Sequence, residues 1–397
     1  MKLSSGLGLA AVGLCCAGVA TMLGSFGCSS SGSGSSGGSS SGGGSGGDTC
    51  SSPGVQCTVQ PSPPSGGAGS GKQHNYAVHT LYLGDTDRTG VTNPDAWKSY
   101  GYNLDNLVTT KTSTDVCTLA AGAAKTTQVD GNGGIDNSFG ENILPIVITT
   151  AGSDAAARIN TSIQSGSFTV MTVINGFDDT GAKTNATGLT GVLLAGGSYA
   201  AAHDGGAPSW DTNTHWPIVP TLIAGCTPAA GCGGTNPDPI GAATIKFPSA
   251  YQANGTFVNG SPASLSLNLS IGGQSLTVNI SSALITFDPK QPGAVTNGTI
   301  AGTIVASDLV NQLQGVAGSI STSLCSGSAF NSIAQQILQA ADIIIDSSGN
   351  VSNTAGTACN GISIGIGFEG TEIAIPVAAD IEGPQTPKPS PCDGGTD

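Results

Sequence analysis

Polar and apolar residues alternate strictly along residues 264–271 and again along residues 275–280. A period of two places successive side chains on opposite faces of a β-strand, so each segment should have one buried and one solvent-facing side. Gly272 and Gly273 lie between the two segments and are typical of a tight turn. The pattern predicts a β-hairpin and disfavours a parallel sheet covered on both faces.

Further strands are expected where β-branched and aromatic residues gather between turn-forming residues. These segments are 76–83, 104–108, 146–150, 167–174, 189–194, 283–287, 299–305, 343–345, 361–368 and 373–377. Many short strands with turns between them are typical of folds that pack sheet against sheet. We therefore expect an all-β fold, a jelly-roll-like antiparallel β-sandwich with minor helices.

Helical periodicity interrupts the strands near 307–341. Ser307 can cap a first helix, in which Leu309 and Leu313 recur at helical spacing. Ser328 can cap a second helix with its own apolar face. The sequence therefore predicts a two-helix insertion in the sandwich.

The first segment, 1–27, has the features of a signal peptide. Lys2 supplies a positive charge, and an apolar run of small residues follows at 7–23. Cys28 comes next, after the small residue Gly27. This arrangement resembles a bacterial lipoprotein signal, which implies that Cys28 is lipidated and that the protein is anchored in the outer membrane. An ordinary cleaved secretory signal is the alternative.

Composition divides the rest of the chain. Residues 28–73 are rich in Ser, Gly and Pro, which predicts a flexible linker. The sandwich domain is expected over 74–383, either as one unit or as two subdomains with a boundary near 235–243. Residues 384–397 are rich in Pro and Gly and are expected to form a disordered tail.

The chain is acidic, with a formal net charge of -14, although only 9% of its residues are charged. An acidic surface repels the phosphates of nucleic acid, so nucleic acid is not an expected partner. Carboxylates are suited to hard cations, and calcium is the candidate cofactor.

Cysteine usage also indicates export. Cys15 and Cys16 lie in the signal peptide and Cys28 is the lipidation site, which leaves eight of the 11 cysteines. An even number in an exported chain predicts disulfides. Proximity along the chain favours three pairs, while other pairings remain open. The three pairs are Cys50 with Cys57, Cys226 with Cys232, and Cys325 with Cys359.

Residues 130–145 form the segment with the most distinctive composition, because glycine, aspartate and asparagine gather there between apolar runs. Its candidate calcium ligands are Asp130, Asn132, Asp136 and Glu141. Ile135 stands where an EF-hand loop needs glycine, so the EF-hand is rejected and a looser calcium site in a sandwich loop remains. The alternative is a bend in which Asp and Asn bond backbone amides.

The sequence contains no convincing pair of nucleophile and base. Ser363 lies in a G-x-S-x-G match at 361–365, but the segment continues as a strand, whereas a nucleophile elbow needs a helix after the turn. The four histidines form no cluster along the chain. A hydrolase using paired aspartates is the alternative to a binding protein. The candidate pairs are Asp178 with Asp179 and Asp204 with Asp211.

One resemblance points to the cell surface. The run D-G-x-x-G-I-D-N-S-F-G at 130–140, with W-x2-Y-G at 97–101 and W-D at 210–211, resembles a group of uncharacterised bacterial surface lipoproteins. The resemblance covers about residues 76–380 and implies a β-rich surface protein with no known activity. We expect an exported, membrane-anchored lipoprotein acting as a non-catalytic surface binding or envelope-structural module. A surface glycan or a protein would be its ligand, and a secreted glycosidase-type or aspartyl hydrolase is the alternative.

Overall fold

The computed structural model describes residues 59–151, 155–271, 274–291, 293–320, 322–325 and 327–384. The strands are β1 (Gly71–Tyr82), β2 (Thr169–Gly176), β3 (Ala186–Gly196), β4 (Ile245–Ala253), β5 (Thr256–Val258), β6 (Ala263–Ile271), β7 (Gln274–Lys290), β8 (Ala294–Val305), β9 (Ile344–Ile345), β10 (Val351–Ser352) and β11 (Gly361–Glu372). The α-helices are α1 (Leu144–Ala151), α2 (Ala155–Gln164), α3 (Tyr199–Ala202), α4 (Ala306–Ile320) and α5 (Gly327–Gln339). Short 3-10 helices are η1 (Ala96–Ser99), η2 (Lys125–Gln128), η4 (Pro220–Leu222), η5 (Thr322–Cys325) and η6 (Ala378–Asp380), and η3 (Phe139–Ile143) is a π-helix.

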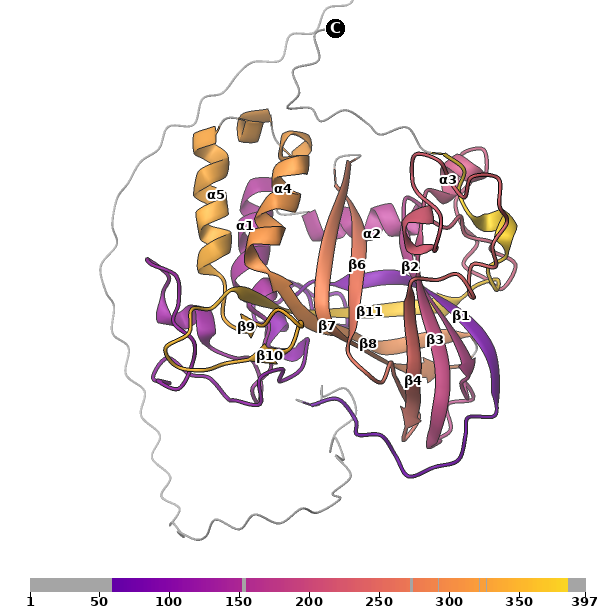
Figure 1. Cartoon of the computed structure of the whole chain (residues 1–397), viewed down its shortest axis with the longest axis horizontal. Helices are drawn as coiled ribbons and strands as arrows, with labels where there is room; N and C mark the ends of the chain where they lie inside the picture. Colours follow the sequence, from indigo (N-terminus) through magenta and orange to yellow (C-terminus); the bar gives the residue numbers. More distant parts are fainter. Residues whose placement is uncertain are drawn as a thin grey trace, which may run out of the picture. The chain divides into compact units, whose positions relative to one another are not determined.

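The sheet closes on itself. Its antiparallel strands lie in the order β5-β4-β3-β2-β1-β11-β8-β7, and β5 pairs back onto β7 through Phe257 with Phe287 and Val258 with Thr286. These eight strands form a barrel, and β6 extends β7 outside the closed ring (Figure 1). The expected β-sandwich is therefore wrong, although the antiparallel, β-rich character is confirmed. Alternation identifies the buried face of each strand but not the partner of the last strand, and that partner decides between a sandwich and a barrel.

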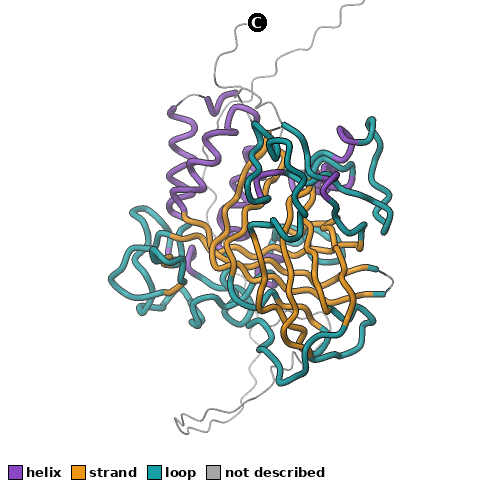
Figure 2. The backbone as a smooth tube through the Cα atoms, turned by 45° about the vertical axis from the view of Figure 1, so that its right-hand side comes forward, coloured by secondary structure: helices purple, strands orange, loops and turns teal. Residues whose placement is uncertain are grey.

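The strands, drawn in orange in Figure 2, surround a core of buried apolar side chains. The rings of Tyr76 on β1 and Phe287 on β7 lie 5.7 Å apart between centroids, although these strands are not neighbours in the sheet. Phe177 and Phe257 join them, and each has an exposed fraction of 0%. Aromatic rings bury large apolar areas and favour such edge-to-face contacts, so this cluster stabilises the closed barrel.

The two ends of the barrel differ. At one end, here called the hairpin end, short connections join β2 to β3, β4 to β5 and β7 to β8. Asn254 and Gly255 make the tightest of them with φ of 50° and 92°, as an Asn-Gly hairpin turn requires. The opposite end carries α1, α2 and α4, which pack onto the same core and lie above the strands in Figure 1. The predicted insertion near 307–341 is confirmed as α4 and α5.

Three segments predicted as strands, 104–108, 146–150 and 373–377, are not strands. Residues 146–150 belong to α1, which continues directly from η3. Pro145 lies just after the π-helical turn and has no N–H to donate to the preceding turn of this continuous helix. Burial of Ile143 and Leu144 in the barrel core outweighs the strand preference of the β-branched residues that follow.

One predicted disulfide is confirmed and one is wrong. Cys226 is bonded to Cys232 as expected. Cys359 is bonded to Cys117 rather than to Cys325, because the segments around them pair through hydrogen bonds from Thr118 N to Thr357 O and from Cys359 N to Thr118 O. Cys325 is itself disulfide-bonded. Cys50 and Cys57 lie outside the described residues.

The expected boundaries fall partly within the structure. The signal peptide 1–27, the start of the linker and the tail from 385 lie outside the described residues. The described residues belong to one compact unit, and β3 pairs with β4 across the suggested boundary near 235–243. No helix in the described part of the chain is long and apolar enough to span a membrane.

Candidate functional site

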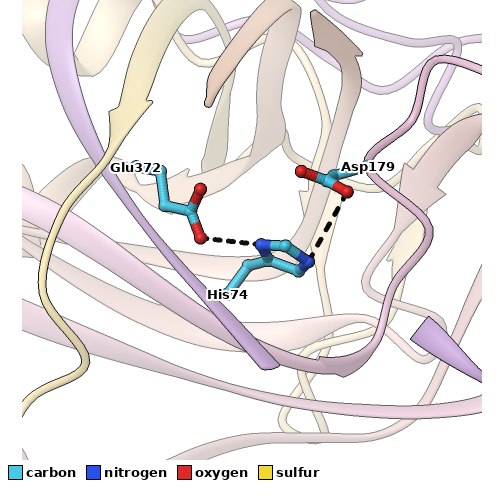
Figure 3. A group of neighbouring side chains, drawn as sticks. All are labelled: His74, Asp179 and Glu372. Atoms are coloured by element: carbon cyan, nitrogen blue, oxygen red, sulfur yellow. Dashed lines mark hydrogen bonds and ion pairs between the residues drawn. The ribbon is translucent and has the colours of Figure 1, made fainter. Parts of the chain in front are cut away.

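A histidine and two carboxylates meet inside the barrel at its hairpin end (Figure 3). His74 and Tyr76 are two positions apart on β1 and therefore point to the same face, with their rings stacked at 5.7 Å. The other ring contact of His74 is with Phe177, edge to face at 6.2 Å. His74 has an exposed fraction of 6%, so the aromatic core holds its ring in place.

The two carboxylates come from distant parts of the chain. Glu372 is the last residue of β11, and its Oε1 lies 2.7 Å from His74 Nδ1. Asp179 lies in the β2–β3 connection, and its Oδ1 lies 3.8 Å from His74 Nε2. The imidazole is therefore placed between two acidic side chains, one on each ring nitrogen, as Figure 3 shows.

Neighbouring residues fix both carboxylates. Gln291, which follows β7, donates from Nε2 to Asp179 Oδ2 at 2.8 Å and also to the carbonyl of Asp179. The backbone N–H of Glu372 donates to the carbonyl of Gly293 at 2.6 Å. Gly293 has a φ of 59°, which glycine adopts without strain. The connection between β7 and β8 thus supports both acidic residues of the site.

Tyr76 places an unsatisfied hydroxyl beside this group. Its side chain has an exposed fraction of 3%, and its Oη has no hydrogen-bond partner. Burial raises the pKa of Tyr76, and the negative charges of Glu372 and Asp179 raise it further. A buried hydroxyl without a partner costs about 1–3 kcal/mol, so its position calls for an explanation.

Two chemical roles are open to the arrangement. His74, Asp179 and Glu372 each offer one ligand atom, and these atoms lie within 4.8 Å of one another. Within the described residues, no other three side chains of His, Cys, Asp or Glu meet this criterion. The group can therefore hold a metal ion, or the histidine can exchange a proton with either carboxylate.

The predicted calcium ligands lie outside this group, and each has its own local partner. Asp136 Oδ2 accepts from Leu104 N at 2.6 Å, and Asp130 Oδ2 accepts from Thr109 N at 2.5 Å. Asn132 is exposed and donates to Ser99 Oγ at 3.0 Å, while Glu141 Oε2 accepts from the amide of the adjacent Asn142. Each of these four side chains thus makes a local hydrogen bond.

Burial controls the electrostatics of that region. It raises the pKa of Asp130 to about 7 and that of Glu141 to about 7. The pKa of Asp136 is raised well above its usual range by burial and then by the negative charges of Asp105, Asp130 and Asp342. Protonated carboxyls can lie close together without the repulsion that ionised ones experience.

The rest of the distinctive segment acts as a structural clamp. Asn137 donates from Nδ2 to the carbonyls of Trp97, Tyr100 and Gly365, and its Oδ1 accepts from Gly365 N at 2.9 Å and Gly140 N at 3.0 Å. Ser138 Oγ donates to the carbonyl of Ala340 at 2.6 Å. These bonds tie the segment after 130 to η1, to β11 and to the end of α5.

The region between 203 and 216 contains no comparable group. His203 stacks on Tyr199 with centroids 3.9 Å apart and bonds its carbonyl. His215 Nδ1 lies 3.1 Å from Asp380 Oδ2, and its side chain is half exposed. Asp211 caps a local turn by accepting from Asn213 N at 2.9 Å. These side chains point into separate local contacts.

Sequence reasoning missed the central residue of the site. His74 and Glu372 are 298 positions apart, and only the pairing of β1 with β11 brings them together. Asp179 was a candidate only as a partner of Asp178, whose carboxylate instead accepts from Thr180 and Thr184. The one available signal is the rarity of glutamate, because Glu372 is one of few in the chain.

No family model, no curated protein and no solved structure matches this chain. The residues of the site and the N-terminal segment are therefore the evidence for a function.

Proposed function

We propose that the protein is an exported lipoprotein, anchored in the outer membrane through Cys28, whose barrel is a non-catalytic binding or envelope-structural module. The observation that carries the proposal is the N-terminal sequence, in which a signal-like segment, Cys28 and a Ser/Gly run precede the folded part. Ala68 already pairs with Thr187 ahead of β1, and the Ser/Gly run that precedes it in the sequence would serve as the tether.

A ligand of this module would bind at the rim of the barrel, since side chains occupy its interior. A surface glycan is one candidate, because aromatic faces stack on sugar rings. Trp97 and Trp216 are buried, so Trp210 would be the tryptophan available for stacking. A glycan array probed with the full-length protein tests this ligand class, and a flat response would favour the envelope-structural role.

Lipidation is tested by growing a Gram-negative host that expresses the full chain with an alkyne-tagged palmitate. The wild-type protein should take up the label and sediment with outer membranes. Cys28→Ala should lose the label, whereas the matched variant Cys16→Ala, inside the signal segment, should keep it. An unlabelled wild-type protein released into the medium would contradict lipid anchoring through Cys28 and favour an ordinary secretory signal.

The alternative, a hydrolase, has one observation in its favour. The carboxylates of Asp179 and Glu372 both face His74, and glycoside hydrolysis needs two carboxylates about 5–10 Å apart across a bound sugar. The two facing oxygens lie within 4.8 Å of each other, at or below the short end of that range. Asp178 does not join them, because its carboxylate is bonded to Thr180 and Thr184. Hydrolysis of a polysaccharide panel by the wild-type protein, lost in Asp179→Asn, would support the alternative.

A further inference from the structure

We propose that His74, Asp179 and Glu372 form a binding site for one divalent transition-metal ion, with Zn²⁺ as the reference ion. The inference deepens the proposed binding function and rests on it only for its biological use, because the metal chemistry depends on the barrel alone. It differs from the calcium site expected at 130–145 in both its place and its ion.

The geometry fits a small ion. The three ligand atoms lie within 4.8 Å of one another, so a point exists within about 2.8 Å of all three. Bonds from zinc to nitrogen or oxygen are about 2.0–2.2 Å long, so each ligand atom would need to move by less than about 1 Å. Rotations of the Glu372 and Asp179 side chains, which are 19% and 25% exposed, can supply that movement.

The ligand types select the class of ion. Imidazole suits zinc, copper, iron and nickel, whereas calcium and magnesium take oxygen ligands. Two carboxylates with a neutral imidazole also balance the charge of a divalent ion. The site lies among Tyr76 and Phe177, and the low dielectric of aromatic surroundings strengthens the attraction between carboxylates and cation.

Tyr76 supplies a second, independent observation. Its hydroxyl is buried, has no hydrogen-bond partner, and is close enough to Asp179 and Glu372 for both charges to act on it. A metal ion with three protein ligands keeps a further position for water. Such a water would donate a hydrogen bond to Tyr76 Oη and give the hydroxyl a partner.

Gln291 orients one of the metal ligands through a hydrogen bond, as residues next to metal ligands usually do. Its bond to Asp179 Oδ2 leaves Oδ1 directed at His74. Groups that orient a ligand in this way typically change metal affinity by about 10–100-fold when removed. Gln291→Leu should therefore weaken metal binding without touching a ligand.

The test uses full-length protein purified in detergent and stripped of metal. Isothermal titration with ZnSO4 should show one ion bound per chain, and Co²⁺ should give visible absorption bands at the same stoichiometry. His74→Ala and Asp179→Asn should each weaken binding at least about tenfold. Tyr76→Phe should weaken it less and remain folded. His215→Ala is the matched control, because His215 pairs with the single carboxylate of Asp380.

Three results would overturn the proposal. The first is the absence of stoichiometric Zn²⁺ or Co²⁺ binding by the wild-type protein, and the second is equal binding by the wild-type protein and the Asp179→Asn variant. If His74→Ala fails to fold by circular dichroism, Asp179→Asn decides, since the amide keeps the shape of the side chain. Ca²⁺ bound more tightly than Zn²⁺ would also contradict it. Palmitate labelling is independent of His74, so failure here leaves lipidation unaffected.

Discussion

Ser363 and Asp342 form a buried pair between β11 and the segment that follows α5. Ser363 Oγ donates to Asp342 Oδ2 at 2.6 Å, and Ser363 N donates to Oδ1 at 2.8 Å. Ser363 Oγ also accepts from Ser138 N at 2.8 Å. Ser363 is 0% exposed, and none of these partners is a histidine that could act as its base. This agrees with the expectation that Ser363 is a strand residue and not a nucleophile. Its role is to hold Asp342.

Asp342 predicts an unusual dependence of stability on pH. Burial raises its pKa to about 7, above the value near 3.9 of an unfolded chain. The folded state therefore binds more protons, and the free energy of unfolding should fall as pH rises from about 4 to about 7. Asp130, Asp136 and Glu141 have raised pKa values as well, so they add to the loss of stability with rising pH. Urea unfolding at several pH values should show that Asp342→Asn removes one share of this loss, on the order of 3 kcal/mol.

The control for this prediction is Asp346→Asn. Asp346 is exposed, and hydrogen bonds from Asn350 lower its pKa, so its contribution has the opposite sign. Stability that rises steadily from pH 4 to pH 7 in the wild-type protein would contradict the raised pKa of Asp342.

Asn137 should be the most sensitive residue of the distinctive segment. Asn137→Ala removes partners from buried carbonyls of Trp97, Tyr100 and Gly365, and unsatisfied buried groups cost about 1–3 kcal/mol each. We expect a loss of about 3 kcal/mol or more in urea unfolding. Asn132→Ala, an exposed change in the same segment, should stay within about 0.5 kcal/mol. Equal effects of the two variants would contradict the clamp.

Local patterns predicted the elements whose neighbours are close in sequence. The alternation at 264–280 became the pair β6 and β7, and the helices expected near 307 and 328 became α4 and α5, with Ser307 and Ser328 inside the first turn rather than at the cap. The barrel depends instead on the pairing of Phe257 with Phe287, which no local period reveals. Closure of a sheet is a long-range property, and β4 and β5, which complete the ring, were not among the expected strands.

The candidate site likewise depends on contacts between residues far apart in the sequence. The segment 130–145 stood out because glycine and short polar residues signal a special backbone, and Asn137 has a structural role there through its bonds to Gly365. His74 gave no such signal, since its partners Asp179 and Glu372 arrive from the β2–β3 connection and from β11. Sites assembled across a barrel become visible only when the order of the strands is known.

Tyr76 and Phe287 should respond oppositely to truncation. Tyr76→Phe removes an unpartnered buried hydroxyl and keeps the ring, so metal-free protein should gain about 1 kcal/mol in urea unfolding. Phe287→Ala leaves a cavity between Tyr76, Phe257 and Phe368 and should cost about 3–5 kcal/mol. A Tyr76→Phe variant that is clearly less stable than the wild-type protein would show that the hydroxyl has a partner.

The two described disulfides should differ in their contribution to stability. Cys117 and Cys359 are 242 positions apart, whereas Cys226 and Cys232 are separated by 6. Because a cross-link removes more entropy from the unfolded chain when it closes a longer loop, the first should contribute about 3 kcal/mol more than the second. Urea unfolding of the paired serine variants at equal pH measures the difference. A larger loss for the short loop would show that strain or residual structure in the unfolded chain, rather than loop length, governs the two bonds.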